Sequence, residues 1–130
     1  MKVGVSNGEV LDKLSILEIK IDNITDELKL GNIKKEHAAL RETIGEPDWF
    51  SHIFRDYGYY DQLKELNERL WDIEDAIRIK ERDQEFDKEF VNLARSVYKT
   101  NDKRAEMKKE INLYTESELI EEKSYEDYSQ

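Results

Sequence analysis

The last long hydrophobic pattern of the chain gives way to charged and amide side chains on the same side of a predicted helix. From about Lys88, the apolar positions have helical spacing: Phe90, Leu93 and Val97. The next positions on that side are polar: Thr100, Asn101, Arg104 and Lys108. A cation that stands where a core should continue needs a carboxylate from another helix or an anionic ligand. The pattern therefore predicts either a structural ion-pair network or a ligand site.

A second polar row lies beside the hydrophobic stripe of the preceding helix, which we expect to begin near Tyr59. Its members are four, three, four and three residues apart: Asn67, Trp71, Glu74, Arg78 and Glu81. A turn at residues 83–87 would make this helix and the next antiparallel neighbours. Glu74 and Asp75 could then meet Arg104. One interpretation is an interhelical ion-pair network that fixes the register of the helices, and the alternative is a polar ligand pocket.

The predicted pocket combines cationic side chains with carboxamides. These groups suit a phosphate, a carboxylate or a sugar, because they offer forked donors and amide groups. The expected lining residues from the first, third and fourth helices are Asp12, Lys13, Glu74, Arg78, Glu81, Asn101, Arg104, Lys108 and Asn112. Docking of the chain end through Leu119 and Ile120 would add Lys123 and Tyr125. We expect no resident cofactor and no metal ligand set.

Paired acids suggest an enzyme as the alternative. Glu65 and Glu68, and likewise Asp72 and Asp75, lie one helical turn apart. All-α nucleotide pyrophosphohydrolases hold magnesium with such pairs, but they draw the second pair from another helix. Here both pairs fall on one predicted helix. The sequence contains no Ser-His-Asp pattern, no glycine-rich phosphate loop and no H-E-x-x-H motif.

Composition limits the class of protein. The length of 130 residues fits one domain, residues 1–130, and the chain contains no cysteine for disulfides or thiolate metal sites. A net charge of −10 argues against general nucleic-acid binding. Half of that excess lies in residues 114–130, which carry six acids and one lysine, so a basic patch elsewhere remains possible.

The sequence also bears on localisation. No apolar run approaches the roughly 18 residues that span a bilayer. The first residues, Met1 to Val5, lack the apolar core of a secretion signal. We therefore expect a cytoplasmic protein.

Capping signals divide the chain into helices. Ser6 to Glu9 has the form of a capping box, which predicts a helix from Asn7 or Gly8. We expect a break at residues 23–25 with Thr25 or Asp26 as the next cap, although one continuous helix to Ile44 is the alternative.

The later boundaries follow from similar signals. Gly45 to Asp48 ends the second helix, and Asp87 is a suitable cap for the fourth, which should run to about Leu113. A second capping box, Thr115 to Glu118, predicts a short final helix. The expected fold is all-α: an antiparallel bundle of about four helices with an extended N-terminus, a short C-terminal helix and an acidic tail.

Four blocks together resemble a known family. They are SNGEVLDKLSILEIK from Ser6, LWDIEDAIRIKE from Leu70, LARSVYKTNDKRAEMKKEIN from Leu93 and EEKSY from Glu121. The family that they resemble comprises small bacterial and phage proteins with a domain of unknown function, often encoded beside glycosyltransferase and surface-polysaccharide genes. The resemblance covers nearly the whole chain.

The resemblance implies no activity, but it implies that the polar residues selected above, together with Asp102 and Glu122, are distinctive of the family. They are Asp12, Lys13, Glu74, Asp75, Arg78, Glu81, Asn101, Asp102, Arg104, Lys108, Asn112, Glu122, Lys123 and Tyr125. Relatives have a glycine-containing turn before the fourth helix, where this chain has residues 83–87.

We therefore expect a non-catalytic binding or accessory protein linked to surface-glycan synthesis. Its site would lie between the third and fourth helices and would take a small anionic or sugar-containing ligand, or else the protein would act through a protein partner. Homo-oligomerisation is left open. The alternative is a small metal-dependent phosphohydrolase or glycan-modifying enzyme that uses Glu74 and Glu81.

Overall fold

The protein is all-helical, as the sequence predicts. A computed structural model describes residues 1–129, and within them no strand is formed. Four long helices and one π-helical turn follow in order: α1 (Asn7–Asn23), α2 (Glu27–Ile44), η1 (His52–Asp56), α3 (Tyr59–Arg82) and α4 (Lys88–Tyr114). No helix in this part of the chain is long and apolar enough to cross a membrane.

Side-chain caps fix where three of the helices begin. The backbone N–H of Glu9 donates to Ser6 Oγ at 3.2 Å, as the capping box predicts for α1. The N–H of Lys29 donates to Asp26 Oδ1 at 2.9 Å. The predicted break between α1 and α2 is therefore confirmed, with Asp26 as the cap. Asp87 caps α4 in the same way.

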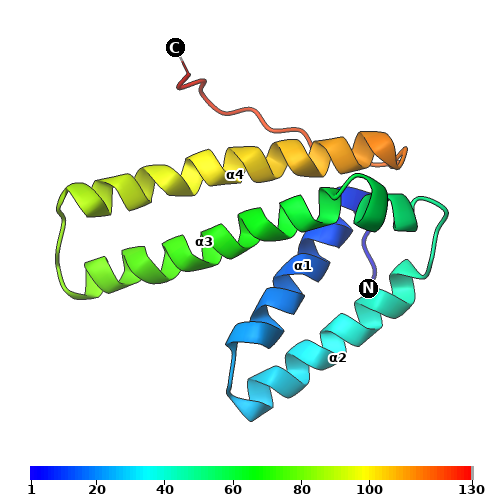
Figure 1. The fold of residues 1–130 in the computed structure, drawn as a ribbon, viewed down its shortest axis with the longest axis horizontal. Coiled ribbons are helices and arrows are strands. Elements are labelled where there is room, and N and C mark those ends of the chain that lie inside the picture. The colour runs from blue at the N-terminus through cyan, green and yellow to red at the C-terminus, as the bar shows by residue number, and fades with distance from the viewer. Residues whose placement is uncertain (130) are drawn as a thin grey trace.

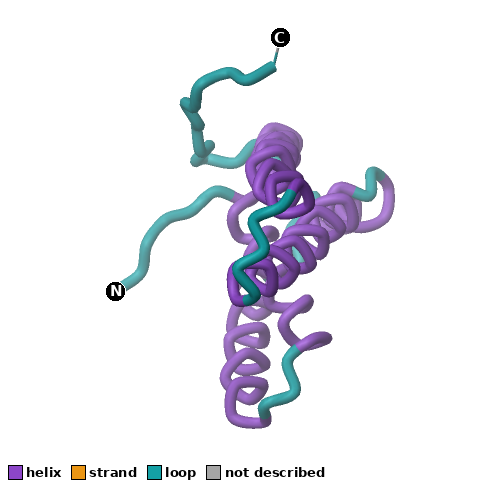
Figure 2. The backbone as a smooth tube through the Cα atoms, turned by 90° about the vertical axis from the view of Figure 1, so that its left-hand side faces the viewer, coloured by secondary structure: helices purple, strands orange, loops and turns teal. Residues whose placement is uncertain are grey.

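The helices pair as two hairpins. α3 and α4 lie side by side, while α1 and α2 form a second hairpin that diverges from the first (Figure 1). α1 packs against both α3 and α4, whereas α2 packs mainly on α1 and has no buried residue. The turned view shows the same separation of the hairpins (Figure 2). The far end of the α3–α4 hairpin therefore extends beyond the part that α1 covers.

The core lies where the start of α1, the start of α3 and the end of α4 meet η1. Its buried members are Leu11, Leu14, Ile53, Tyr60, Leu63 and Ile111. α1 and α4 approach so closely here that a Cβ on Gly8 would lie 2.5 Å from the carbonyl oxygen of Lys108. Only a residue without a side chain fits at this crossing, so Gly8 determines how deeply α1 seats against α4.

The turn between α3 and α4 is built without glycine. Gln84 takes the left-handed conformation, with φ 54°, that favours glycine. Lys80 Nζ donates to Glu85 at 3.0 Å and to Asp87 at 2.9 Å, which ties the end of α3 to the cap of α4. These carboxylates hold the pKa of Lys80 above its ordinary value.

The short final helix that the second capping box predicts does not form. From Thr115 to residue 129 the chain is non-helical and returns along α4 (Figure 1). The Thr115 hydroxyl expected to cap that helix instead binds the start of α1, as does the hydroxyl of Ser117. Asn7 Nδ2 donates to Thr115 Oγ1 at 2.9 Å, and the Asn7 N–H donates to Ser117 Oγ at 3.0 Å. The prediction was wrong because it considered only local partners for these hydroxyls.

Candidate functional site

Arg104 of α4 binds a buried carboxylate on α1. Its Nε donates to Asp12 Oδ1 at 2.8 Å and its NH2 group donates to Asp12 Oδ2 at 2.5 Å, so the ion pair is bidentate. The Asp12 side chain is only 2% exposed, against 27% for Arg104. The carboxylate of Asp12 holds the pKa of Arg104 above its ordinary value. The cation predicted to need a partner therefore has one inside the protein.

The partner differs from the one we expected. The sequence pattern pointed to Glu74 or Asp75 on α3 as the partner of Arg104. Instead, α1 packs against both α3 and α4 and places Asp12 against the guanidinium. Glu74 instead accepts from Arg78, one turn away on the surface of α3, at 3.2 Å. Asn101 is a secondary partner of Arg104, at 3.4 Å.

A buried hydrogen-bond network extends the ion pair to α3. Asn67 Nδ2 donates to Asp12 Oδ1 at 2.9 Å and to Ser15 Oγ at 2.8 Å. Ser15 Oγ in turn donates to the carbonyl oxygen of Asp12 at 2.7 Å. Ser15 was not among the predicted site residues, although its place one turn after Asp12 on the buried side of α1 is a signal for such a network. The network joins α1, α3 and α4 and satisfies the charge of Asp12.

The first cavity beside this network, here called the groove, has a volume of about 470 Å³ and lies between α1, α3 and α4. It is lined by four of the predicted site residues: Glu74, Arg78, Asn101 and Arg104. Trp71 and Asp75 of α3 and Lys20 of α1 also line it. No hydrogen bond or ion pair within residues 1–129 engages these last three side chains. The groove therefore offers an aromatic ring, a carboxylate and an ammonium group to a ligand.

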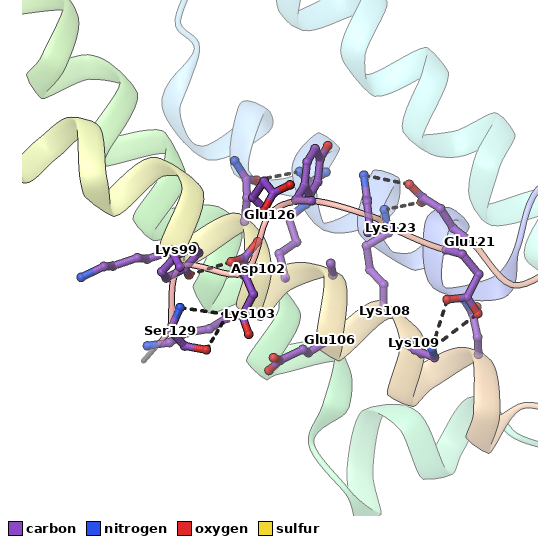
Figure 3. A pocket seen from close by; sticks show the side chains of 18 residues that line it. Lys99, Asp102, Lys103, Glu106, Lys108, Lys109, Glu121, Lys123, Glu126 and Ser129 are labelled. Atoms are coloured by element: carbon purple, nitrogen blue, oxygen red, sulfur yellow. Dashed lines mark hydrogen bonds and ion pairs between the residues drawn. The ribbon is translucent and has the colours of Figure 1, made fainter.

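A second cavity, here called the tail cavity, has a volume of about 800 Å³ between α4 and the C-terminal residues 121–129 (Figure 3). Its α4 wall carries two acids, Asp102 and Glu106, and five cations: Lys99, Lys103, Arg104, Lys108 and Lys109. Its C-terminal wall carries one cation, Lys123, and four acids: Glu121, Glu122, Glu126 and Asp127. The net charges of the two walls are thus +3 and −3. Arg104 and Asn101 line both cavities.

Ion pairs and one tyrosine hold the C-terminal residues on α4. Lys108 Nζ lies 3.4 Å from Glu121 Oε2, and Lys109 Nζ lies 3.2 Å from Glu122 Oε2. The cations of Lys123 and Lys108 hold the pKa of Glu121 below its ordinary value. The Tyr128 hydroxyl donates to Asp102 at 2.6 Å, which raises the pKa of Tyr128 to about 12.

The other predicted site residues have different positions. Asn112 lines the tail cavity, but it is only 2% exposed and its Oδ1 accepts from the Gly8 N–H at 2.6 Å, so this oxygen serves the first turn of α1. Lys13 pairs with Glu36 of α2 at 3.0 Å and lines neither cavity. Glu81 lines neither cavity either.

Lys123 and Tyr125 both line the tail cavity. Lys123 Nζ lies 6.0 Å from the centre of the Tyr125 ring, and Tyr125 is 77% exposed. Within residues 1–129, no group of three or more histidine, aspartate or glutamate side chains is arranged to hold a metal ion.

Comparison with known families agrees with the resemblance noted in the sequence. The profile of a family described as "Family of unknown function (DUF6165)" matches residues 1–129. The chain belongs to this family. No curated protein and no solved structure matches the chain. The description of the family carries no activity, so function must be argued from the two cavities and the network between them.

Proposed function

We propose that this family member is a non-catalytic binding or accessory protein whose groove takes a sugar-containing ligand. The observation that carries the proposal is that the half-buried Trp71 lines a cavity of about 470 Å³ together with the unengaged Asp75 and Lys20. The apolar face of a sugar ring packs on an indole ring, while its hydroxyl groups both donate and accept hydrogen bonds. Ligand pockets typically combine such an aromatic wall with a few polar groups.

The charges in the groove favour a sugar over a small, strongly charged anion. Asp12 neutralises Arg104, and Glu74 neutralises Arg78, which leaves few free cations for an anion. The unengaged pair in the groove, Asp75 and Lys20, has balanced charge. Such a pair suits a hydroxyl-rich ligand, because carboxylates accept and ammonium groups donate.

The setting of the protein is part of the same proposal. The resemblance to proteins encoded beside glycosyltransferase genes supports an accessory role in surface-glycan synthesis, in the cytoplasm of a bacterium or of a phage-infected cell. The protein would bind a protein partner in that synthesis in addition to the sugar-containing ligand. The enzyme alternative has no observation in its favour, because Glu74 is engaged by Arg78 and Glu81 lines neither cavity.

A panel of neutral mono- and oligosaccharides tests the proposal by ligand-observed NMR and titration calorimetry. We expect at least one sugar to bind. Asp75→Asn should weaken that binding by about tenfold, the loss typical of a hydrogen bond to a charged group. Trp71→Ala should weaken it by about as much, because the sugar ring loses the indole on which it packs. Asp72→Asn is the matched control, since Asp72 lies on the same helix but outside the groove. The proposal would be wrong if no sugar bound, or if both groove variants bound as the wild type does.

A further inference from the structure

The basic wall of α4 is unusual in an acidic protein. The chain has a net charge of −10, yet the α4 side of the tail cavity carries a net charge of +3. Like charges so close together repel one another and favour a bound counter-charge. In this structure the counter-charge comes from the protein itself: Asp12 and Glu9 of α1 pair with Arg104 and Lys108, and the acids of the C-terminal residues cover the rest of the wall (Figure 3).

The carboxylate of Glu121 occupies the position that an external anion would take. It lies 2.9 Å from Lys123 Nζ through one oxygen and 3.4 Å from Lys108 Nζ through the other. Glu122 is placed similarly on Lys109. A phosphate group offers more charge and more acceptor oxygens than a carboxylate, so it would bind the same ammonium groups more strongly.

The covering residues are held loosely enough to be displaced. The side chains of Glu121 and Glu122 remain 43% and 72% exposed, and exposed ion pairs contribute little net stability. Lys108, by contrast, is only 12% exposed and is held by Glu9 of α1 at 2.6 Å. A fixed ammonium group under a loosely held carboxylate favours exchange of that carboxylate for a ligand.

We infer that the α4 wall of the tail cavity is a phosphate-binding subsite, which Glu121 and Glu122 fill when no ligand is bound. The inference rests on the proposed function for its biological meaning, because Arg104 and Asn101 line both the tail cavity and the groove. A ligand that passes this shared wall places a sugar on Trp71 and a phosphate on Lys108 and Lys109 of α4, with Lys123 of the C-terminal residues on the other side of the cavity. The ligand class is therefore a phosphorylated sugar, either a sugar phosphate or a sugar linked to a diphosphate.

Titration with inorganic pyrophosphate, followed by calorimetry at low ionic strength, tests the subsite without any sugar. Glu121→Gln/Glu122→Gln removes the competing carboxylates and should tighten pyrophosphate binding by about tenfold. Lys109→Gln/Lys123→Gln removes two exposed cations and should weaken it by about as much. Glu116→Gln/Glu118→Gln and Lys34→Gln/Lys35→Gln are the matched controls, because they make the same charge changes, of two units each, outside the cavity.

Absence of pyrophosphate binding to the Glu121→Gln/Glu122→Gln variant would overturn the inference. Equal affinity in the wild type and the Lys109→Gln/Lys123→Gln variant would overturn it too. Sodium chloride at matched ionic strength is run in parallel, since an equal response to chloride would show only general screening and would also count against the subsite. Binding of pyrophosphate by a protein that binds no sugar would support the subsite while contradicting the proposed function, so the two failures are distinct.

Discussion

The carboxylate of Asp12 is the residue on which the arrangement around Arg104 depends. It is nearly inaccessible and accepts hydrogen bonds from Arg104 and Asn67, on two different helices. A buried ion pair of this kind adds little to stability compared with an apolar pair, but loss of one partner leaves a charge without compensation. Asp12 and Arg104 are therefore positioning residues, and they orient the wall shared by the groove and the tail cavity.

Replacement of Arg104 tests this role. Arg104→Met should lower the free energy of unfolding by about 3–5 kcal/mol, because it leaves the buried carboxylate of Asp12 without a cationic partner. Arg78→Met is the matched control and should cost less than about 1 kcal/mol, because the Arg78–Glu74 pair is exposed. Urea denaturation measures both changes. Adding Asp12→Asn to Arg104→Met should restore part of the loss, and a double variant less stable than Arg104→Met alone would contradict the account.

At the scale of elements, the crossing of α1 and α4 decides where the network lies. The first turn of α1 donates its N–H groups to Asn112 and Ser117, which follow more than a hundred residues later. Side chains at the end of α4 and just beyond it therefore help to cap α1, so the start of α1 is satisfied by tertiary partners as well as by Ser6. This crossing brings Asp12 within reach of Arg104. Asp12 lies one turn along α1 from Gly8, and Arg104 lies one turn along α4 from Lys108, whose carbonyl oxygen faces Gly8.

A pair of glycine substitutions tests the crossing. Gly8→Ala should destabilise the protein by about 1–3 kcal/mol, because the new Cβ would overlap the Lys108 carbonyl oxygen and approach Asn112. Gly31→Ala should stabilise it by about 0.5–1 kcal/mol, because no atom lies within 4 Å of that Cβ and alanine favours a helix. Thermal melts followed by circular dichroism compare the two. An equal stabilisation by both changes would exclude the close approach.

At the scale of the whole molecule, two diverging hairpins leave much of α4 without a helical neighbour on its outer side. The C-terminal residues cover part of that surface with acids on cations, so the negative end of the chain and the basic wall of α4 neutralise each other. The acids that are concentrated at the end of the sequence therefore lie, in the folded protein, next to the cations of α4.

Acid should release the C-terminal residues from α4. The pKa of Glu121 is lowered by Lys123 and Lys108, so this carboxylate contributes attachment above its ordinary pKa and loses it as pH falls through the lowered value. Tyr128 ring signals in NMR should move toward those of an unstructured peptide over this acidic range, while the helical circular dichroism stays. In the Glu121→Gln variant, the part of the Tyr128 chemical-shift change that comes from titration of this carboxyl should be absent. Tyr128 signals that do not change in the wild type would contradict ion-paired attachment.

Local sequence signals predicted the helices well. Ser6, Asp26 and Asp87 cap helices where the patterns place them, since a cap depends on residues within one turn. The same local reasoning failed at Thr115, because its hydroxyl binds Asn7 across the fold. It also failed to identify the partner of Arg104, because no local pattern distinguishes Asp12 from the acids of α3.

The amino-acid pattern alone determined that the chain is helical, where its long helices begin, and that Arg104 must meet a negative group. Only the tertiary structure decided that this group is Asp12, that the polar residues divide between two cavities, and that the acidic end of the chain lies on the basic wall of α4. The physical reason is the distance along the chain over which each interaction acts. Helix formation depends on neighbours a few residues away, whereas charge pairing depends on which surfaces the packing of α1 brings together.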